Sequence, residues 1–79
     1  MLKSIELEAE LCTKEGLFKL SASLRICGDY YALIHDYKKL PIKFLPKYRI
    51  SKIEDAISEF EEFAIDVQED LLKEFKNGN

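Results

Sequence analysis

The sequence has few of the residues from which small catalytic and metal sites are built. Its 79 residues include one histidine, two cysteines and no tryptophan. Asp36 follows the histidine, His35, but neighbouring residues of a strand point to opposite faces, so the two cannot form a histidine–carboxylate pair. The chain also lacks a phosphate-binding loop and a nucleophile beside a base. We therefore expect a protein that is not an enzyme, with no catalytic residues, no metal site and no cofactor.

Long apolar runs are also missing. The stretch MLKSIELEAEL alternates apolar and charged residues, so we expect neither a signal peptide nor a membrane-spanning helix, and no membrane partner. Without a secretory signal, Cys12 and Cys27 are expected as free thiols in the cytoplasm. A chain of 79 residues predicts one small domain over 1–79, with one core and little room for a deep pocket.

Alternation of apolar and polar side chains is the main pattern that is present. It runs through residues 4–12, 17–27 and 30–37 with the period of two that is typical of half-buried strands. Glu15-Gly16 and Gly28-Asp29 are suited to two-residue hairpin loops between them. The pattern therefore predicts an antiparallel three-stranded meander.

The two loops also predict how the strands pair. A loop at Glu15-Gly16 would place Leu11 opposite Leu20, and a loop at Gly28-Asp29 would place Leu24 opposite Leu33. Both pairings gather the apolar side chains on one face of the sheet. A slip by one residue would move them to the other face, which burial opposes.

A long helix is predicted over about 52–76. Ser51 and Glu54 form a capping-box pattern, and helical periodicity starts directly afterwards. The predicted apolar stripe comprises Ile53, Ile57, Phe60, Ala64, Val67, Leu71 and Phe75, widened by Ala56 and Phe63. At 1.5 Å per residue the helix is about 38 Å long, so it matches the sheet in length. The expected fold is α+β, with this helix packed on one face of the meander.

A basic connector over 38–50 joins the sheet to the helix. Its prolines, Pro41 and Pro46, exclude a central strand and allow a loop or a short fourth strand at the edge. Basic residues mixed with aromatics can also grip single-stranded nucleic acid. The residues expected to make such contacts are Lys38, Lys39, Lys43, Lys47, Tyr48 and Arg49. The other interpretation is that the connector's apolar residues close the core while its basic residues offset an acidic helix.

Acidic residues are predicted to form two surfaces. The first is a solvent-facing ridge of the helix, made of Asp55, Glu59, Glu62, Asp66, Glu69 and Asp70. The second is the outer face of the first strand, with Glu6, Glu8 and Glu10. The favoured interpretation is a small interaction or regulatory protein, such as an inhibitor, that binds another protein through these surfaces. Nucleic acid is the less favoured partner because the net charge is -3 and the pI is about 5.1.

Two helix residues lie outside the apolar stripe. Ile65 and Leu72 are seven residues apart and therefore share one side of the helix. Either the 38–50 segment covers them, or the helix of a second copy does so in a homodimer. The sequence leaves both alternatives open.

Overall fold

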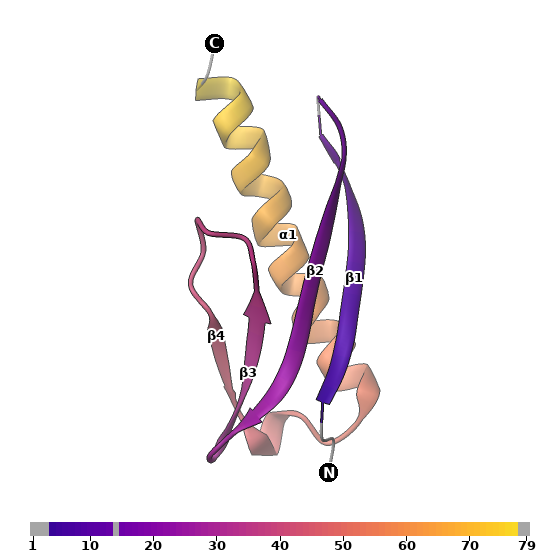
Figure 1. Cartoon of the computed structure of the whole chain (residues 1–79), viewed down its shortest axis with the longest axis vertical. Helices are drawn as coiled ribbons and strands as arrows, with labels where there is room; N and C mark the ends of the chain where they lie inside the picture. The colour runs from indigo at the N-terminus through magenta and orange to yellow at the C-terminus, as the bar shows by residue number, and fades with distance from the viewer. Residues whose placement is uncertain (1–3, 14, 78–79) are drawn as a thin grey trace.

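The protein is an elongated α+β domain (Figure 1). The structure, a computed structural model, describes residues 4–13 and 15–77, with helix side chains described as far as Lys73. In chain order the elements are β1 (Ser4–Thr13), β2 (Gly16–Cys27), β3 (Tyr30–His35), β4 (Lys43–Pro46), the 3₁₀ helix η1 (Lys47–Arg49) and α1 (Ile53–Asn77). The expected fold class is confirmed, and the sheet has the fourth, short strand.

The four strands form one antiparallel sheet in the order β1-β2-β3-β4. The predicted hairpin between β2 and β3 is confirmed, because Leu24 pairs with Leu33 and Cys27 with Tyr30. Gly28 has a φ of 60°, the left-handed conformation that a two-residue hairpin loop with glycine first requires.

The predicted pairing of β1 with β2 is wrong by two residues. Leu11 lies opposite Phe18 instead of Leu20, and the last pair of the ladder is Thr13 with Gly16. Gly16 has a φ of 129°, and its carbonyl oxygen accepts a 2.8 Å hydrogen bond from the Thr13 hydroxyl. This glycine therefore closes the hairpin and is not part of its loop. A slip of two residues keeps every side chain on its face, so alternation cannot detect it.

The start of α1 is stabilised by a different residue from the one predicted. Asp55, not Glu54, accepts hydrogen bonds from the backbone N–H groups of Ser51 and Lys52 at 3.0 and 3.2 Å, and from the Ser51 hydroxyl at 3.1 Å. These bonds lower the pKa of the Asp55 carboxyl, with the Ser51 backbone bond the largest cause. Asp55 thereby supplies the side-chain half of a capping box.

One core lies between α1 and the inner face of the sheet. Its buried helix residues are Ala56, Phe60, Phe63, Ala64 and Val67, with Leu71 partly buried. Ile53 and Ile57, which the periodicity placed in the stripe, are 53% and 39% exposed. The helix is therefore turned toward its Ala56 and Phe63 side. The Phe75 side chain lies outside the described residues.

The connector closes the core with only part of its apolar side chains. Leu45 and Ile50 are buried and Leu40 is partly buried, as predicted. Ile42 and Phe44 are exposed instead. Phe44 is exposed because residues of β4 alternate between the two faces of the sheet, and Ile42 lies just before the strand. No helix in the described part of the chain is long and apolar enough to cross a membrane.

Candidate functional site

The contacts of His35 indicate a structural role for this side chain. It pairs with Ala22 on the inner face of the sheet, and its ring lies 4.3 Å from that of Phe63, centroid to centroid. Its Nδ1 accepts a hydrogen bond from the Tyr37 N–H at 3.0 Å, so Nε2 carries the proton and donates to the Pro41 carbonyl at 3.1 Å. Both ring nitrogens are used to hold the chain as it leaves β3.

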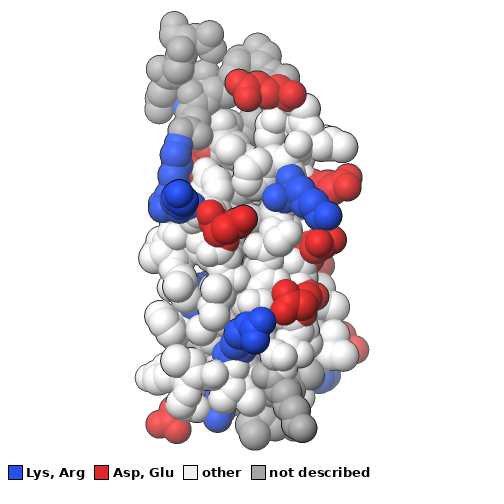
Figure 2. Space-filling view, in the orientation of Figure 1, with Lys and Arg blue, Asp and Glu red and all other residues white. Residues whose placement is uncertain are grey.

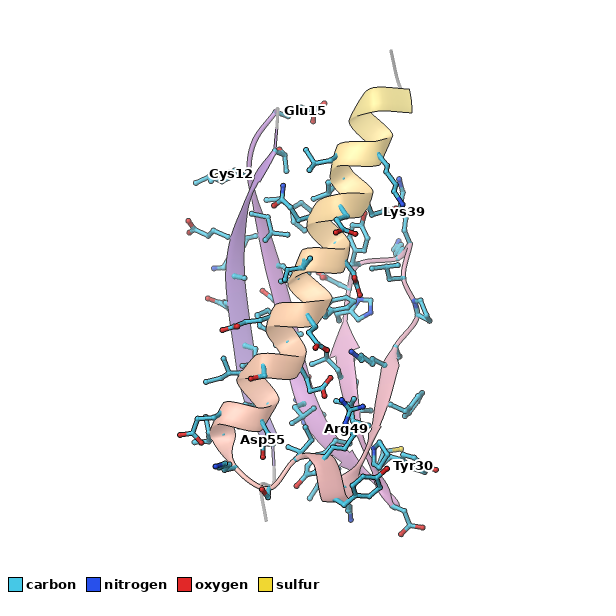
Figure 3. The ribbon with its side chains drawn as sticks, turned by 180° about the vertical axis from the view of Figure 1, so that it is seen from behind. Cys12, Glu15, Tyr30, Lys39, Arg49 and Asp55 are labelled. Atoms are coloured by element: carbon cyan, nitrogen blue, oxygen red, sulfur yellow. The ribbon has the colours of Figure 1, made fainter. Side chains whose placement is uncertain are left out.

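The two cysteines lie far apart. Both are free and exposed. Cys12 is near the β1–β2 hairpin, and Cys27 pairs with Tyr30 at the opposite end of the sheet (Figure 3). Within residues 4–13 and 15–77, no group of histidine, cysteine and carboxylate side chains is arranged to hold a metal ion.

The predicted acidic ridge of the helix is divided by the turn of α1. Asp55 caps the helix, Glu59 is only 7% exposed, and Asp70 is partly buried. The prediction that these three face solvent as one ridge is therefore wrong. The three acidic residues of the ridge that remain exposed are Glu62, Asp66 and Glu69.

The buried carboxylate of Glu59 is held by two cations from the connector. Arg49 Nη2 donates a 2.7 Å hydrogen bond to Oε1, and Lys43 Nζ lies 3.2 Å from Oε2. The Lys43 contact has the geometry of an ion pair and not of a hydrogen bond, since Oε2 has no hydrogen-bond partner among the described residues. Lys43 also lies 3.7 Å from Glu62. These contacts join β4 and η1 to the middle of α1.

A second polar contact joins the end of β3 to α1. The Tyr37 hydroxyl donates a hydrogen bond to Asp70. Burial of the tyrosine raises its pKa from 10.0 to about 12, and the hydrogen bond and negative charge of Asp70 add to the shift. Tyr37 therefore stays protonated and hydrogen-bonded well above neutral pH.

The basic and aromatic residues proposed for nucleic-acid contact do not form one surface. Lys38 and Lys39 precede β4, whereas Lys47, Tyr48 and Arg49 follow it, so the two groups lie at opposite ends of the strand (Figure 3). Between them, Lys43 is directed to Glu59, which also binds Arg49. Tyr48 is 85% exposed.

No described element covers the outer face of the sheet, since α1 lies on the inner face. Along β1 it bears the predicted glutamate row, Glu6, Glu8 and Glu10, all exposed. The Glu6 carboxylate lies 3.4 Å from Arg25 Nη2, and the Glu8 carboxylate lies 3.4 Å from Lys19 Nζ. Exposed pairs of this kind contribute little to stability, so the row remains available to a partner.

Over β3 and β4 the outer face has a cluster of exposed apolar side chains, here called the outer patch. Its members are Tyr30, Ile34, Ile42 and Phe44. Phe44 is 57% exposed and lies opposite Ala32, an outward-facing residue that is only 5% exposed because larger side chains surround it. Figure 2 shows that charged side chains are scarce over these strands and frequent on the β1 side.

Sequence reasoning missed the outer patch. The core-closing interpretation of the connector included its apolar residues Ile42 and Phe44, although alternation within KFLP puts Phe44 and Leu45 on opposite faces. Tyr30 and Ile34 have the opposite phase to Tyr31 and Leu33, which was the available signal.

Ile65 and Leu72 are 57% and 49% exposed. The prediction that the 38–50 segment covers them is therefore wrong. The helix of a second copy stays an untested alternative.

Comparison of the chain with protein-family models, with curated proteins and with solved structures found no match in any of the three.

Proposed function

We propose that the protein is a small non-enzymatic interaction module that binds another protein through the outer face of its sheet. The observation that supports this most is the outer patch, whose four side chains are 39–57% exposed, with Phe44 opposite Ala32, the residue midway between Tyr30 and Ile34 in β3. Exposed apolar clusters next to polar residues are typical of protein-binding sites. The aromatic members, Tyr30 and Phe44, are of the kind that dominates binding energy at such sites.

The glutamate row defines the chemistry of the partner. Strands are about 4.8 Å apart, so the row lies roughly 10 to 14 Å from the outer patch and within the same footprint of about 800 Å². A partner with an apolar centre and a rim of lysine or arginine on one side would match both. Such charge complementarity chiefly speeds association and excludes other partners.

Two other surfaces of the protein are alternative binding sites within this proposal. Glu62, Asp66 and Glu69 form a smaller acidic surface on α1 that could contact a second basic partner. Ile65 and Leu72 offer an apolar contact through which two copies could pair.

The cysteines bear on the compartment in which the protein works. Free, exposed Cys12 and Cys27 suit a reducing compartment such as the cytoplasm.

Single-stranded nucleic acid is less well supported as the partner. A backbone-binding groove needs a continuous run of cations. Here Lys43 and Arg49 are paired with Glu59, and the remaining basic residues are divided between the two ends of β4.

Affinity capture from an extract of the producing cells, with variants of the outer patch, tests the proposal. The variant Ile34→Ser/Phe44→Ser should capture at least about tenfold less of the partner protein than the wild type does. The reason is that removal of an aromatic hot-spot side chain costs roughly 2 kcal/mol of binding free energy. The matched control is Tyr48→Ser, which removes a more exposed aromatic outside the patch. Circular dichroism should show both variants folded.

Equal capture by the patch variant and the wild type would contradict the proposal. Fluorescence anisotropy with labelled single-stranded and duplex oligonucleotides provides the counter-test. Binding that weakens steeply with salt would favour nucleic acid instead.

A further inference from the structure

The free edge of β1 is long, and the charged residues along it are all glutamates. β1 has ten residues and pairs only with β2, so one edge has no strand partner among residues 4–13 and 15–77. Natural proteins usually blunt such edges with lysine, proline, a bulge or a covering element. The stretch SIELEAELCT has no lysine and no proline, and its ladder with β2 is continuous.

One hydrogen bond identifies the backbone groups that face this edge. Gln68 Nε2 of α1 donates to the Cys12 carbonyl oxygen at 2.7 Å. That oxygen must point away from β2 to be reached, and in an antiparallel strand the outward groups belong to every second residue. The N–H and C=O groups of Glu6, Glu8 and Glu10 therefore face the free edge together with those of Cys12.

The helix extends past this edge. In Figures 1 and 3 the first turns of α1 reach beyond β1 on the side away from β2. Ile53 and Ile57 in these turns have the phase of the core stripe, yet they are 53% and 39% exposed. These two side chains therefore give the turns of α1 that extend past β1 an exposed apolar surface.

The charge of β1 selects against a second copy at this edge. In the antiparallel registers that pair the middle of one β1 strand with the middle of another, outward groups meet outward groups, and glutamates face glutamates. Like charges directly opposite are destabilising. Within the sheet, Glu8 and Glu6 are already paired with Lys19 and Arg25 of β2. Glu8, Ala9, Glu10 and Lys19 also line a shallow open depression of about 270 Å³.

We propose that the β1 edge binds an extended segment of a partner protein whose residues alternate between basic and apolar, by antiparallel strand addition. The basic side chains lie on the outer face against the glutamate row, and the apolar ones lie beneath Ile53 and Ile57. Main-chain hydrogen bonds supply affinity and the alternate side chains supply specificity. This inference rests on the proposed function, because its ligand is a segment of a protein.

Fluorescence anisotropy with a labelled peptide of alternating lysine and valine, as long as β1, tests the inference. The lysine peptide should bind, and a glutamate–valine peptide should not. Methylation of the backbone nitrogens of the lysine residues should abolish binding, because the lysines lie opposite the glutamates and their N–H groups face β1. Methylation of the backbone nitrogens of the valine residues should leave binding unchanged, because those N–H groups face away from β1. Absence of binding, or equal effects of the two methylation patterns, would overturn strand addition.

Matched protein variants locate the peptide. Glu8→Lys should weaken binding roughly fivefold to tenfold, since it replaces an attractive cross-strand pair by a repulsive one, whereas Glu69→Lys on the exposed side of α1 should change it less than about twofold. Ile57→Ser should weaken binding, and Tyr48→Ser, which removes an exposed aromatic side chain beyond β4 at the other edge of the sheet, should not. Equal effects within either pair of variants would overturn the assignment to this edge.

The outcomes separate the two proposals. Ile34→Ser/Phe44→Ser leaves the β1 edge intact and should not alter peptide binding. If the peptide fails to bind while partner capture still depends on the outer patch, the strand-addition inference fails and the proposed function stands. If the peptide binds while the outer-patch variant captures as much partner protein as the wild type, the proposed outer-face site fails.

Discussion

Removal of the two cations that hold Glu59 should destabilise the fold far more than removal of either one. Glu59 is 7% exposed, while the side chains of Lys43 and Arg49 are 34% and 50% exposed. Loss of one partner from a fully buried ion pair costs about 3 to 5 kcal/mol, and an exposed pair contributes about 0 to 1. For this half-buried cluster we expect about 1 kcal/mol for a single variant and about 3 for Lys43→Met/Arg49→Met.

The two single variants should also differ from each other. Arg49 donates a 2.7 Å hydrogen bond to Glu59, whereas Lys43 contributes an ion pair without hydrogen-bond geometry. Arg49→Met should therefore be the more destabilising change. A hydrogen bond to a charged group contributes about 1.5 to 3 kcal/mol, and solvent exposure of the guanidinium reduces that value here.

Replacement of Glu59 itself completes the cycle. Glu59→Met added to the double variant removes the unpaired buried charge and should recover about 2 kcal/mol, because apolar substitutes for buried ion pairs are often neutral. Urea unfolding followed by circular dichroism measures each value. A chain of this size has a total stability of only about 4 to 12 kcal/mol, and each kcal/mol shifts the melting temperature by roughly 4 to 8 °C. A double variant within about 0.5 kcal/mol of wild type, or a triple variant without recovery, would refute the reasoning.

Three other changes test separate contacts. Tyr37→Phe removes the hydrogen bond to Asp70 and should lower the free energy of unfolding by about 1 to 2 kcal/mol. Because the pKa of Tyr37 is raised from 10.0 to about 12 on folding, wild-type stability should decline as the pH rises through that interval, and less so in Tyr37→Phe. The pKa of Asp55 is lowered on folding, so its carboxylate stabilises the fold above the ordinary carboxyl pKa, and this contribution is lost as the pH falls through the lowered value. In Asp55→Asn the melting temperature should therefore fall less steeply with decreasing pH than in the wild type. Glutamine at all three positions of the glutamate row should promote self-association, visible as a concentration-dependent mass in light scattering; an unchanged mass would argue against repulsion as the barrier to self-pairing.

The faces of the strands could be predicted from the sequence, but the pairing of the first two could not. Alternation assigns each side chain to a face and excludes slips of one residue. A slip of two residues preserves the faces, so the choice between Leu20 and Phe18 opposite Leu11 depends on the turn. There the decisive fact is the φ of Gly16, which only the folded chain reveals.

The position and length of α1 were also predictable, but its rotation about its own axis was not. The apolar residues cover an arc wide enough for the helix to face the sheet in more than one way. Contacts from other elements select among them, since Tyr37, Lys43 and Arg49 all bond to one flank of α1. That selection buried Glu59 and left Ile57 exposed, and both results changed the candidate site.

The basic connector and the acidic surfaces are best understood together. Lys43 and Arg49 lie where they neutralise Glu59, the acid nearest the core, so the most basic segment of the chain contributes little free positive charge at that point. On the helix, Asp55 accepts hydrogen bonds at the helix start and Asp70 accepts one from Tyr37. Internal pairing thus removes charge from the inner layer, whereas the glutamate row has only exposed, weak pairs. The β1 side of the outer face consequently presents three exposed carboxylates next to a long free strand edge, where a basic partner strand would be attracted.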